Sequence, residues 1–168
     1  MSVPLANELS LPERPLESWE LRLLDLYLTD ADEKLMPFVN LLGRIELLEE
    51  VLNRRLLRKS VQVNASEGMV VLDELNDRQI PLDALSSGEQ HEIILMFDLL
   101  FSVPEGALVL IDEPEISLHI GWQVEFIPDI QRIANIRDLR FIVATHSPQI
   151  INGRWESAVR LGPSDTEF

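Results

Sequence analysis

Two adjacent carboxylates, Asp112 and Glu113, directly follow the apolar run Leu108–Ile111. A short continuous apolar run is typical of a strand in a parallel sheet that is buried on both faces. Open α/β sheets bind their ligands at the carboxyl ends of such strands, so acids there are more often functional than acids elsewhere. The pair therefore favours ligand chemistry at the rim of a sheet. A helix-capping or turn role is the alternative.

A second segment that could do chemistry is Leu85–Gln90, with the sequence LSSGEQ, immediately before a predicted helix. A hydroxyl, free backbone N–H groups and the positive end of a helix dipole together make an anion site that suits a phosphate. The alternative is a simple N-cap, in which Ser86 or Ser87 caps a helix with acids in its first turn.

The third segment is Ala144–Pro148, with the sequence ATHSP, in which His146 follows a second apolar strand. Parallel neighbouring strands end at the same edge of a sheet, so we expect His146 at the same rim as Asp112 and Glu113. A histidine aligned with two acids at a sheet rim favours a ligand contact over a structural role.

The elements that must position these residues follow from the apolar spacing. Apolar residues that recur three and four positions apart predict one helix near 16–28 and a longer helix that ends near Lys59. These helices would either pack on a core or form a coiled coil. Alternation then predicts a hairpin with its turn at Glu67–Gly68. The remaining predicted elements are a polar loop, a helix over 89–102, the strand GALVLID, a helix over 119–136 and the strand RFIVAT. The two strands would be joined through the helix over 119–136 by a right-handed crossover.

Composition limits the classes of function. The chain has 168 residues, enough for one domain, and a formal net charge of −15, which disfavours direct binding of nucleic acid. The basic cluster Arg54, Arg55, Arg58 and Lys59 is an exception, for which a solvated helix end is the alternative. The absence of cysteine excludes disulfides and thiolate metal sites. No apolar run predicts a signal peptide or membrane span, so a cytoplasmic protein without a membrane partner is expected.

The three segments, in this order and spacing, resemble the C-terminal half of an ABC-type ATPase. The likeness is to the soluble branch, that is, AAA-family ATPases related to overcoming-lysogenization-defect proteins, structural-maintenance (SMC) proteins and phage-defence ATPases. It covers roughly residues 50–162 and includes SLHIGWQ. The resemblance implies an α/β fold, a partial P-loop NTPase with parallel core strands, a β-hairpin and an N-terminal helical segment. The expected organisation is an extended lead-in over 1–15, a helical segment over 16–60 and the ATPase lobe over 61–168.

The resemblance also implies roles for the residues at the rim. Asp112 matches the Walker B aspartate, which holds Mg²⁺ through water beside the phosphates of ATP. Glu113 matches the catalytic glutamate that positions and polarises the attacking water. His146 matches the switch histidine that contacts the γ-phosphate.

Two further groups match segments that act between subunits. Ser86, Ser87, Gly88 and Glu89 match the signature that touches the nucleotide held by the opposite subunit. Ser117, Leu118 and His119 match the loop that crosses the dimer interface. Ser87 stands where many transporters have glycine, and Glu89 where they have glutamine, so the transporter signature is not reproduced in detail.

The phosphate-gripping half of such a site is missing, because no G-x-x-x-x-G-K-[ST] occurs in the sequence. A fragment of a longer ATPase, a split gene with the Walker A half in trans, and a degenerate interaction module are the three explanations. We expect weak ATP binding by the chain alone. Without the missing half it should also expose an apolar sheet edge and associate.

The expected function is therefore ATP binding and hydrolysis by a soluble ABC-type ATPase that dimerises around ATP and Mg²⁺, with activity only when a Walker A half is supplied. Its partners would be a second copy or a Walker A-containing chain, with DNA or an effector nuclease reached through other domains, in DNA repair or phage defence. Nuclease activity in this chain is not expected. The alternative is a non-catalytic scaffold that uses the helical segment for partner contacts.

Overall fold

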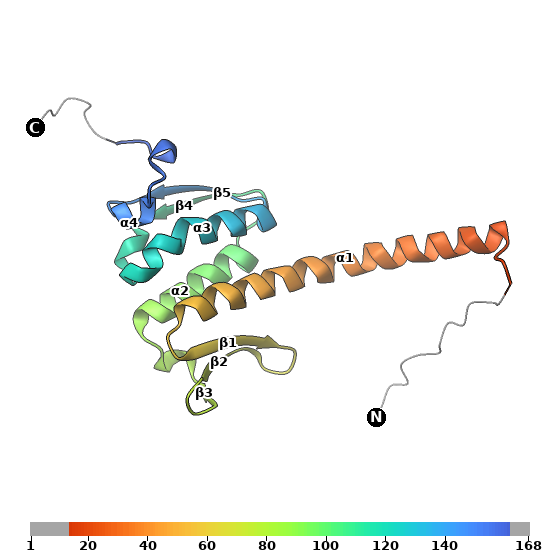
Figure 1. The fold of residues 1–168 in the computed structure, drawn as a ribbon, viewed down its shortest axis with the longest axis horizontal. Helices are drawn as coiled ribbons and strands as arrows, with labels where there is room; N and C mark the ends of the chain where they lie inside the picture. Colours follow the sequence, from red (N-terminus) through yellow and green to blue (C-terminus); the bar gives the residue numbers. More distant parts are fainter. Residues whose placement is uncertain (1–13, 162–168) are drawn as a thin grey trace, which may run out of the picture. The chain divides into compact units, whose positions relative to one another are not determined.

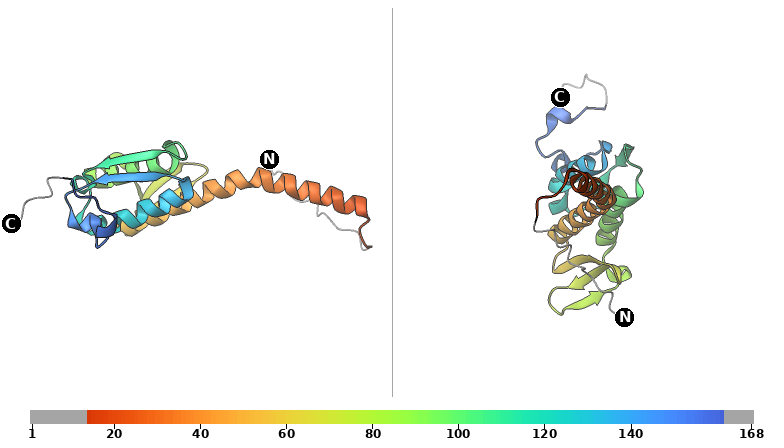
Figure 2. Two further views of the ribbon diagram at one scale, coloured as in Figure 1. Left: turned by 90° about the horizontal axis from the view of Figure 1, so that it is seen from above. Right: turned by 90° about the vertical axis from the view of Figure 1, so that its right-hand side faces the viewer.

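The computed structural model describes residues 14–161. The chain divides into two compact units, Met1–Leu41 and Leu42–Phe168. The expected extended lead-in over residues 1–15 lies outside the described residues, except for Arg14 and Pro15. Figures 1 and 2 show the elements, coloured along the sequence.

The first element is a single helix, α1 (Ser18–Arg55), so the prediction of two separate helices in this region was wrong. The residues between the predicted helices support helical structure instead of breaking it. Thr29 Oγ1 donates a hydrogen bond to the Asp25 carbonyl at 2.8 Å, and Lys34 pairs with Asp30 one turn earlier at 2.7 Å. Pro37 lies inside the helix without ending it.

The apolar residues of α1 differ in exposure along the helix. In the first unit most of them are exposed, namely Trp19, Leu21, Leu23, Leu26, Tyr27, Leu28, Leu35, Met36, Phe38, Val39 and Leu41. In the second unit Leu47, Leu48, Val51 and Leu52 are buried. Glu49 is a polar residue among these buried apolar ones. Its Oε1 accepts a hydrogen bond from the backbone N–H of Val63, at 2.6 Å.

An antiparallel sheet follows, with strands β1 (Lys59–Asn64), β2 (Gly68–Asp73) and β3 (Arg78–Ile80). The predicted hairpin is confirmed, with Asn64 opposite Gly68 and a left-handed φ of 74° at Gly68 that suits glycine. Strand β3 lies in the segment predicted as a polar loop. A strand of three residues is too short to show an alternating pattern in the sequence. Strand β3 is defined by its pairing with β2.

The rest of the chain alternates helices and strands. Its elements are η1 (Leu82–Ala84), α2 (Ser87–Phe97), the π-helical turn η2 (Asp98–Ser102), β4 (Leu108–Asp112), η3 (Pro114–Ile116), α3 (Ile120–Arg137), β5 (Arg140–Ala144), α4 (Pro148–Ile151) and η4 (Trp155–Ser157). Strands β4 and β5 are parallel, with Asp112 opposite Ala144. The predicted strand, helix, strand unit is therefore confirmed.

Within residues 42–161, the C-terminal part of α1, α2 and α3 lie between the two sheets (Figures 1 and 2). The core joins α1, β1, β2, α2 and α3, and one face of the parallel sheet packs against it through Val109, Ile111, Phe141 and Val143. The opposite face carries Leu108, Leu110 and Ile142, which are 52%, 70% and 57% exposed. The prediction that this strand is buried on both faces was wrong for the part of the chain that the structure describes.

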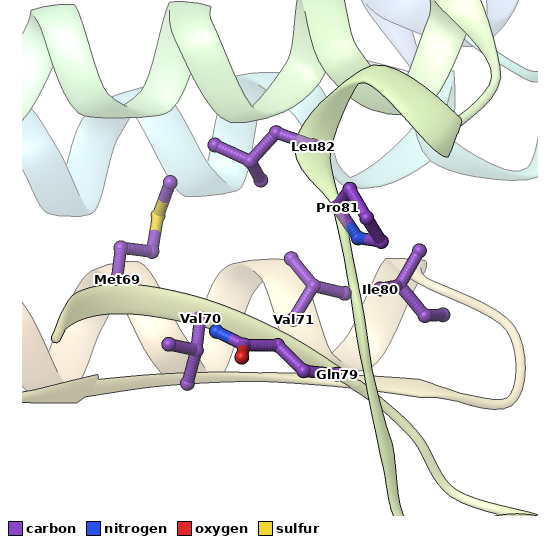
Figure 3. A pocket seen from close by; sticks show the side chains of 7 residues that line it. All are labelled: Met69, Val70, Val71, Gln79, Ile80, Pro81 and Leu82. Carbon is purple, nitrogen blue, oxygen red and sulfur yellow. The ribbon is translucent and has the colours of Figure 1, made fainter.

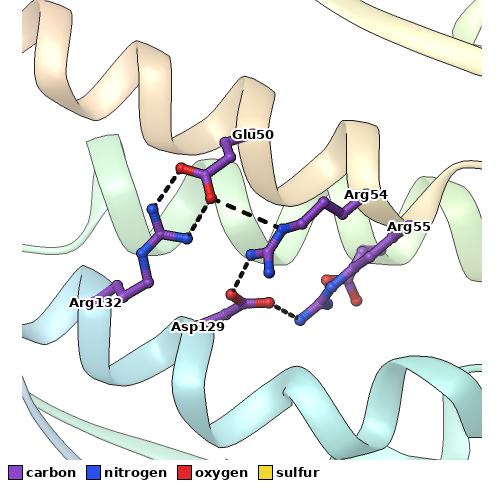
Figure 4. Close-up of polar contacts among 6 residues, drawn as sticks. Glu50, Arg54, Arg55, Asp129 and Arg132 are labelled. Atoms are coloured by element: carbon purple, nitrogen blue, oxygen red, sulfur yellow. Dashed lines mark hydrogen bonds and ion pairs between the residues drawn. The ribbon is translucent and has the colours of Figure 1, made fainter.

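Ion pairs connect the C-terminal end of α1 to α3 (Figure 4). Asp129 accepts hydrogen bonds from Arg54 at 2.7 Å and from Arg55 at 2.5 Å, and Glu50 pairs with Arg132 at 2.5 Å. The pair between Arg55 and Asp129 is buried. Arg55 is thus used inside the fold, whereas Arg54, with a side chain 43% exposed, and Arg58 lie at the surface.

Arg55 also reaches α2. Its guanidinium forms an ion pair with Glu92, which is fully buried. Burial lowers the pKa of Arg55, and the neighbouring Asp129 carboxylate opposes that change. The junction of α1, α2 and α3 therefore contains buried charges that depend on each other.

Candidate functional site

The two acids that end β4 differ in their surroundings. Asp112 is exposed, and within residues 14–161 its carboxylate forms no hydrogen bond or ion pair. Glu113 adopts a left-handed backbone conformation, with φ 46° and ψ 54°, and its N–H donates to the Ala144 carbonyl at 2.8 Å. A left-handed conformation is uncommon for a residue other than glycine, and such residues cluster at functional sites. The geometry fixes Glu113 against the end of β5.

The structure brings His146 next to Glu113. Nε2 of His146 lies 3.6 Å from Oε1 of Glu113, and their side chains are 90% and 42% exposed. The contact follows from the register, since β4 and β5 end side by side at Asp112 and Ala144. An acid and a histidine are thus presented together at the carboxyl edge of the parallel sheet, open to a ligand.

The residues at this edge fit a magnesium ion bound with nucleotide. No group of three or more His, Cys, Asp or Glu that could hold a metal ion by itself occurs among the described residues. Mg²⁺ in nucleotide sites is commonly held by one or two carboxylates, with phosphates and water completing its shell. The unengaged carboxylate of Asp112 meets that requirement.

Glu115, which follows β4, joins the two loops at this edge. Its Oε2 accepts a hydrogen bond from Thr145 Oγ1, and its Oε1 accepts one from the backbone N–H of His146, both at 2.7 Å. Burial favours a higher pKa for Glu115, but the hydrogen bonds from Thr145 and from backbone N–H groups outweigh it, so the pKa is lowered. The carboxylate therefore stays ionised and holds the His146 backbone.

The signature-like segment forms a capped helix start. Ser86 is the N-cap of α2, and Ser87 is the first helical residue. Ser86 and Glu89 form a capping box, in which Oε2 of Glu89 accepts from the N–H of Ser86 at 3.0 Å and from its hydroxyl at 2.9 Å. Lys59 holds the other carboxylate oxygen of Glu89 at 2.6 Å. The N-cap alternative for Ser86 is thus realised.

The segment that matches the interface loop lies beside this helix start. A Cβ added to Gly88 would lie 3.4 Å from the carbonyl oxygen of Ser117. Leu118 is buried in the core, and His119 caps α3 by accepting from the Gly121 N–H at 3.2 Å. The structure thus brings Gly88 and Ser117 together within one chain.

The same helix start is separate from the acid and histidine pair. Among the hydrogen bonds and ion pairs of the described residues, none joins the segment 86–89 to Asp112, Glu113 or His146. Two candidate groups therefore stand on one chain, one at the carboxyl edge of β4 and β5 and the other at the start of α2.

Glu89 makes the stability of the fold pH-dependent. Burial raises its pKa, but hydrogen bonds from Lys59 and Ser86 lower it further, so the folded-state pKa is below the usual value of 4.5. Its stabilising contribution is present above the unfolded-state pKa and is lost as the pH falls through the folded-state pKa. We expect Glu89→Gln to flatten the loss of thermal stability between about pH 5 and pH 3. Thermal melts across this range check the prediction, and an equal slope for the wild type and Glu89→Gln would contradict it.

A hollow of about 310 Å³ lies elsewhere, against β2, β3 and the start of η1 (Figure 3). Its lining includes Met69, Val71 and Leu82 and contains none of the candidate residues. The candidate site is instead an open edge of the parallel sheet. No described helix is both long and apolar enough to cross a membrane.

Two kinds of relatives resemble the chain. A probable ATPase of retron Ec83 from Escherichia coli is 44% identical over 43 residues, which are 26% of this chain and 8% of the relative. Only a small part of that relative is therefore represented here. Two solved structures of SMC proteins align with the chain at 15% and 13% identity.

The first of these structures is an SMC head bound to the C-terminal winged-helix domain of ScpA, with a TM-score of 0.42 and coverage of 64% of this chain and 36% of that chain. The second comes from work on ATP-driven dimerization and DNA-stimulated activation of SMC ATPases, with a TM-score of 0.44 and coverage of 71% and 75%.

The sequence profile of one protein family matches residues 2–152, which is most of the chain. The family is described as an AAA domain, putative AbiEii toxin, of a type IV toxin–antitoxin system. The resemblance to soluble AAA-family ATPases that the three segments predicted is confirmed by this match. The chain belongs to the AAA_21 family of AAA domains.

Proposed function

We propose that this chain supplies the hydrolytic half of an ABC-type ATPase site. The observation that carries the proposal is the contact between Glu113 and His146, 3.6 Å apart at the carboxyl edge of β4 and β5, beside the unengaged carboxylate of Asp112. Hydrolysis of a nucleotide γ-phosphate uses a metal ligand, a base and a phosphate sensor among its side chains.

Each residue has a distinct task in this proposal. Asp112 would hold Mg²⁺, whose charge offsets that of the phosphates when nucleotide is bound. Glu113 orients a water molecule and takes up its proton. His146 donates a hydrogen bond to the γ-phosphate, and its exposed ring is free to reach a ligand. Since Glu113 and His146 are in contact, one γ-phosphate with its attacking water could touch both.

The second candidate group acts on a nucleotide held by another subunit. The hydroxyl of Ser86, together with N–H groups at the start of α2 outside the capping box, would form an anion site once that hydroxyl leaves Glu89. The Ser86 hydroxyl now donates to Glu89 and would turn toward the phosphate on binding. Two copies arranged head to tail would sandwich ATP, so that binding closes the dimer and hydrolysis releases it. The interface loop Ser117–His119, which lies against Gly88 through Ser117, would follow that closure.

The ATPase is proposed to require a Walker A half, on the same polypeptide or in trans. The exposed residues Leu108, Leu110 and Ile142 support this requirement, because an apolar sheet face of this kind is normally covered by protein. DNA or an effector nuclease, reached through other domains in DNA repair or phage defence, would be what the cycle acts on.

The exposed sheet face gives a direct test. We expect Leu110→Gln to weaken self-association, and binding to a Walker A half, by about tenfold or more, because it places a polar group where apolar contact is needed. Leu75→Gln is a matched control, since Leu75 and Leu110 are each 70% exposed. Sedimentation velocity measures both variants. Equal association of the two would contradict a role for this face.

Reconstitution tests the function itself. The chain is mixed with the Walker A half of an AAA_21 ATPase, and phosphate release is followed with and without Mg²⁺. We expect little hydrolysis by either part alone and magnesium-dependent hydrolysis by the mixture, because the two halves complete one site. A mixture no faster than the Walker A half alone would rule out the proposed function. His146→Ala should lower the rate of the mixture without preventing the two parts from associating.

A second candidate is a non-catalytic interaction module. It is favoured by the exposed apolar residues of α1 in Met1–Leu41, among them Trp19, Leu28 and Phe38. A chain that acts only by binding partners would lose binding when these residues are made polar and would be indifferent to changes at Asp112 and Glu113. The reconstitution separates the two candidates.

A further inference from the structure

The loop that carries His146 and the loop that carries Ser117–His119 are joined by side chains outside the proposed catalytic set. Thr145 and His146 follow β5, and Glu115 follows β4, yet the carboxylate of Glu115 accepts hydrogen bonds from both. Ser147 continues the chain of contacts, since its N–H donates to Thr145 Oγ1 at 3.0 Å. The backbone of His146 is thereby held while its side chain is 90% exposed.

Gln123, on the first turns of α3, joins the same two loops from the other side. Its Oε1 lies 2.7 Å from the hydroxyl of Ser147. Its Nε2 donates to the carbonyl oxygens of Leu118 at 3.2 Å and Glu115 at 3.5 Å. Carbonyl oxygens only accept, so the amide group of Gln123 can face the loop in one orientation alone. One side chain therefore contacts the segment after β4 and the segment after β5.

These contacts are internal to the chain and partly shielded from water, which increases their effect on loop geometry. Glu115, Gln123 and Ser147 are all intermediate or buried in exposure. A rigid connection between the two loops has a functional consequence if His146 senses the γ-phosphate and Ser117–His119 crosses to a second subunit. A movement of one loop would then displace the other.

We propose that Glu115 and Gln123 are positioning residues that hold the His146 loop and the Ser117–His119 loop as one unit, so that loss of the γ-phosphate is transmitted to the subunit interface. This inference rests on the proposed function for its consequence, but the connection itself belongs to the isolated chain. Neither residue touches the nucleotide, and both act through the loops that they hold.

The first measurement is amide hydrogen exchange in the isolated full chain. Glu115→Ala should raise exchange of the His146 and Ser147 amides about fivefold or more. Gln123→Met, which keeps the length of the side chain, should raise exchange in both 115–118 and 145–147. Gln149→Met is the matched control, because Gln149 Oε1 also lies 3.0 Å from the Ser147 hydroxyl but, among the hydrogen bonds of the described residues, the Gln149 side chain has none to the other loop. In the Gln149→Met variant, amide exchange in residues 115–118 should equal that of the wild type.

The second measurement is steady-state hydrolysis by each variant mixed with the Walker A half. Glu115→Ala should lower kcat about tenfold and change KM for ATP less than about twofold, because it displaces a sensor without removing a binding group. Glu115→Gln should restore most of kcat, since its oxygen can accept from the His146 N–H and its NH₂ can donate to Thr145 Oγ1.

The outcomes separate this inference from the proposed function. An inactive wild-type mixture would defeat the proposed function, and exchange in the isolated chain would then decide whether the connection exists. Unchanged exchange in both loops after Gln123→Met would overturn the inference. An active wild-type mixture with equal kcat for Glu115→Ala would also overturn it, whatever the exchange shows. Thermal melting checks that each variant is folded.

Discussion

Glu113→Gln, in the chain mixed with a Walker A half, is expected to lower ATP hydrolysis by about two to three orders of magnitude while ATP stays bound. Glutamine has nearly the shape of glutamate but cannot take up a proton from water. Oε1 of Glu113 lies 3.6 Å from Nε2 of His146, so the substitution changes the base at the place where the phosphate sensor stands. The nucleotide contacts proposed for Asp112 and Ser86 are left in place.

Two measurements check this prediction. Single-turnover hydrolysis gives the chemical rate, and equilibrium binding of ATP shows that affinity is retained. The trapped state should also keep the two subunits associated longer than the wild type does. Glu105→Gln is the matched control, because Glu105 is an exposed acid before the opposite end of β4. A Glu113→Gln rate equal to the Glu105→Gln rate would show that Glu113 is not the base.

Asp129→Ala is expected to have the largest effect on stability, a loss of about 3–5 kcal/mol. Asp129 is 1% exposed and pairs with Arg55, which is similarly buried and also pairs with Glu92. Removing the carboxylate leaves the Arg55 guanidinium inside the fold with Glu92 as its remaining ion-pair partner among the described residues. Denaturant unfolding of both proteins measures the difference in free energy of unfolding.

Glu50→Ala is a close control, because the pair of Glu50 with Arg132 joins the same two helices, α1 and α3 (Figure 4). Its side chains are 51% and 42% exposed, so solvent screens the interaction, and its loss should cost at most about 1 kcal/mol. Similar losses for Asp129→Ala and Glu50→Ala would mean that burial does not set the strength of these pairs. Replacing Arg55, Glu92 and Asp129 together by apolar residues should cost far less than Asp129→Ala alone.

The strong local patterns of the sequence predicted the parallel pair and its helix. The runs before Asp112 and Thr145 are apolar and short, and the helix between them begins and ends within one residue of its expected limits. The burial of β4 was misjudged because its continuous apolar run implies cover on two faces, whereas the described residues supply cover on one. The run of apolar residues does not reveal which face is covered, because Leu108, Leu110 and Ile142 are exposed while Val109 and Ile111 pack on the core.

Contacts between distant residues could not be predicted from local patterns. Arg55 and Asp129 are 74 positions apart, so nothing in the spacing indicated that one cation of the basic cluster is buried inside the fold. The hydrogen bonds of Glu115 with Thr145 and His146 span 30 and 31 positions, so no local pattern indicated that Glu115 joins the two loops. The proximity of His146 to Glu113, in contrast, followed from the parallel order of two recognisable strands.

The left-handed backbone of Glu113 places a cost on the fold. A residue that carries a Cβ loses about 1–2 kcal/mol in this conformation, asparagine and aspartate less, and the hydrogen bond from the Glu113 N–H to the Ala144 carbonyl helps to maintain it. Glycine at this position would relieve the strain and also remove the carboxylate. If Glu113 is the base, selection for stability and selection for activity oppose each other at this one residue.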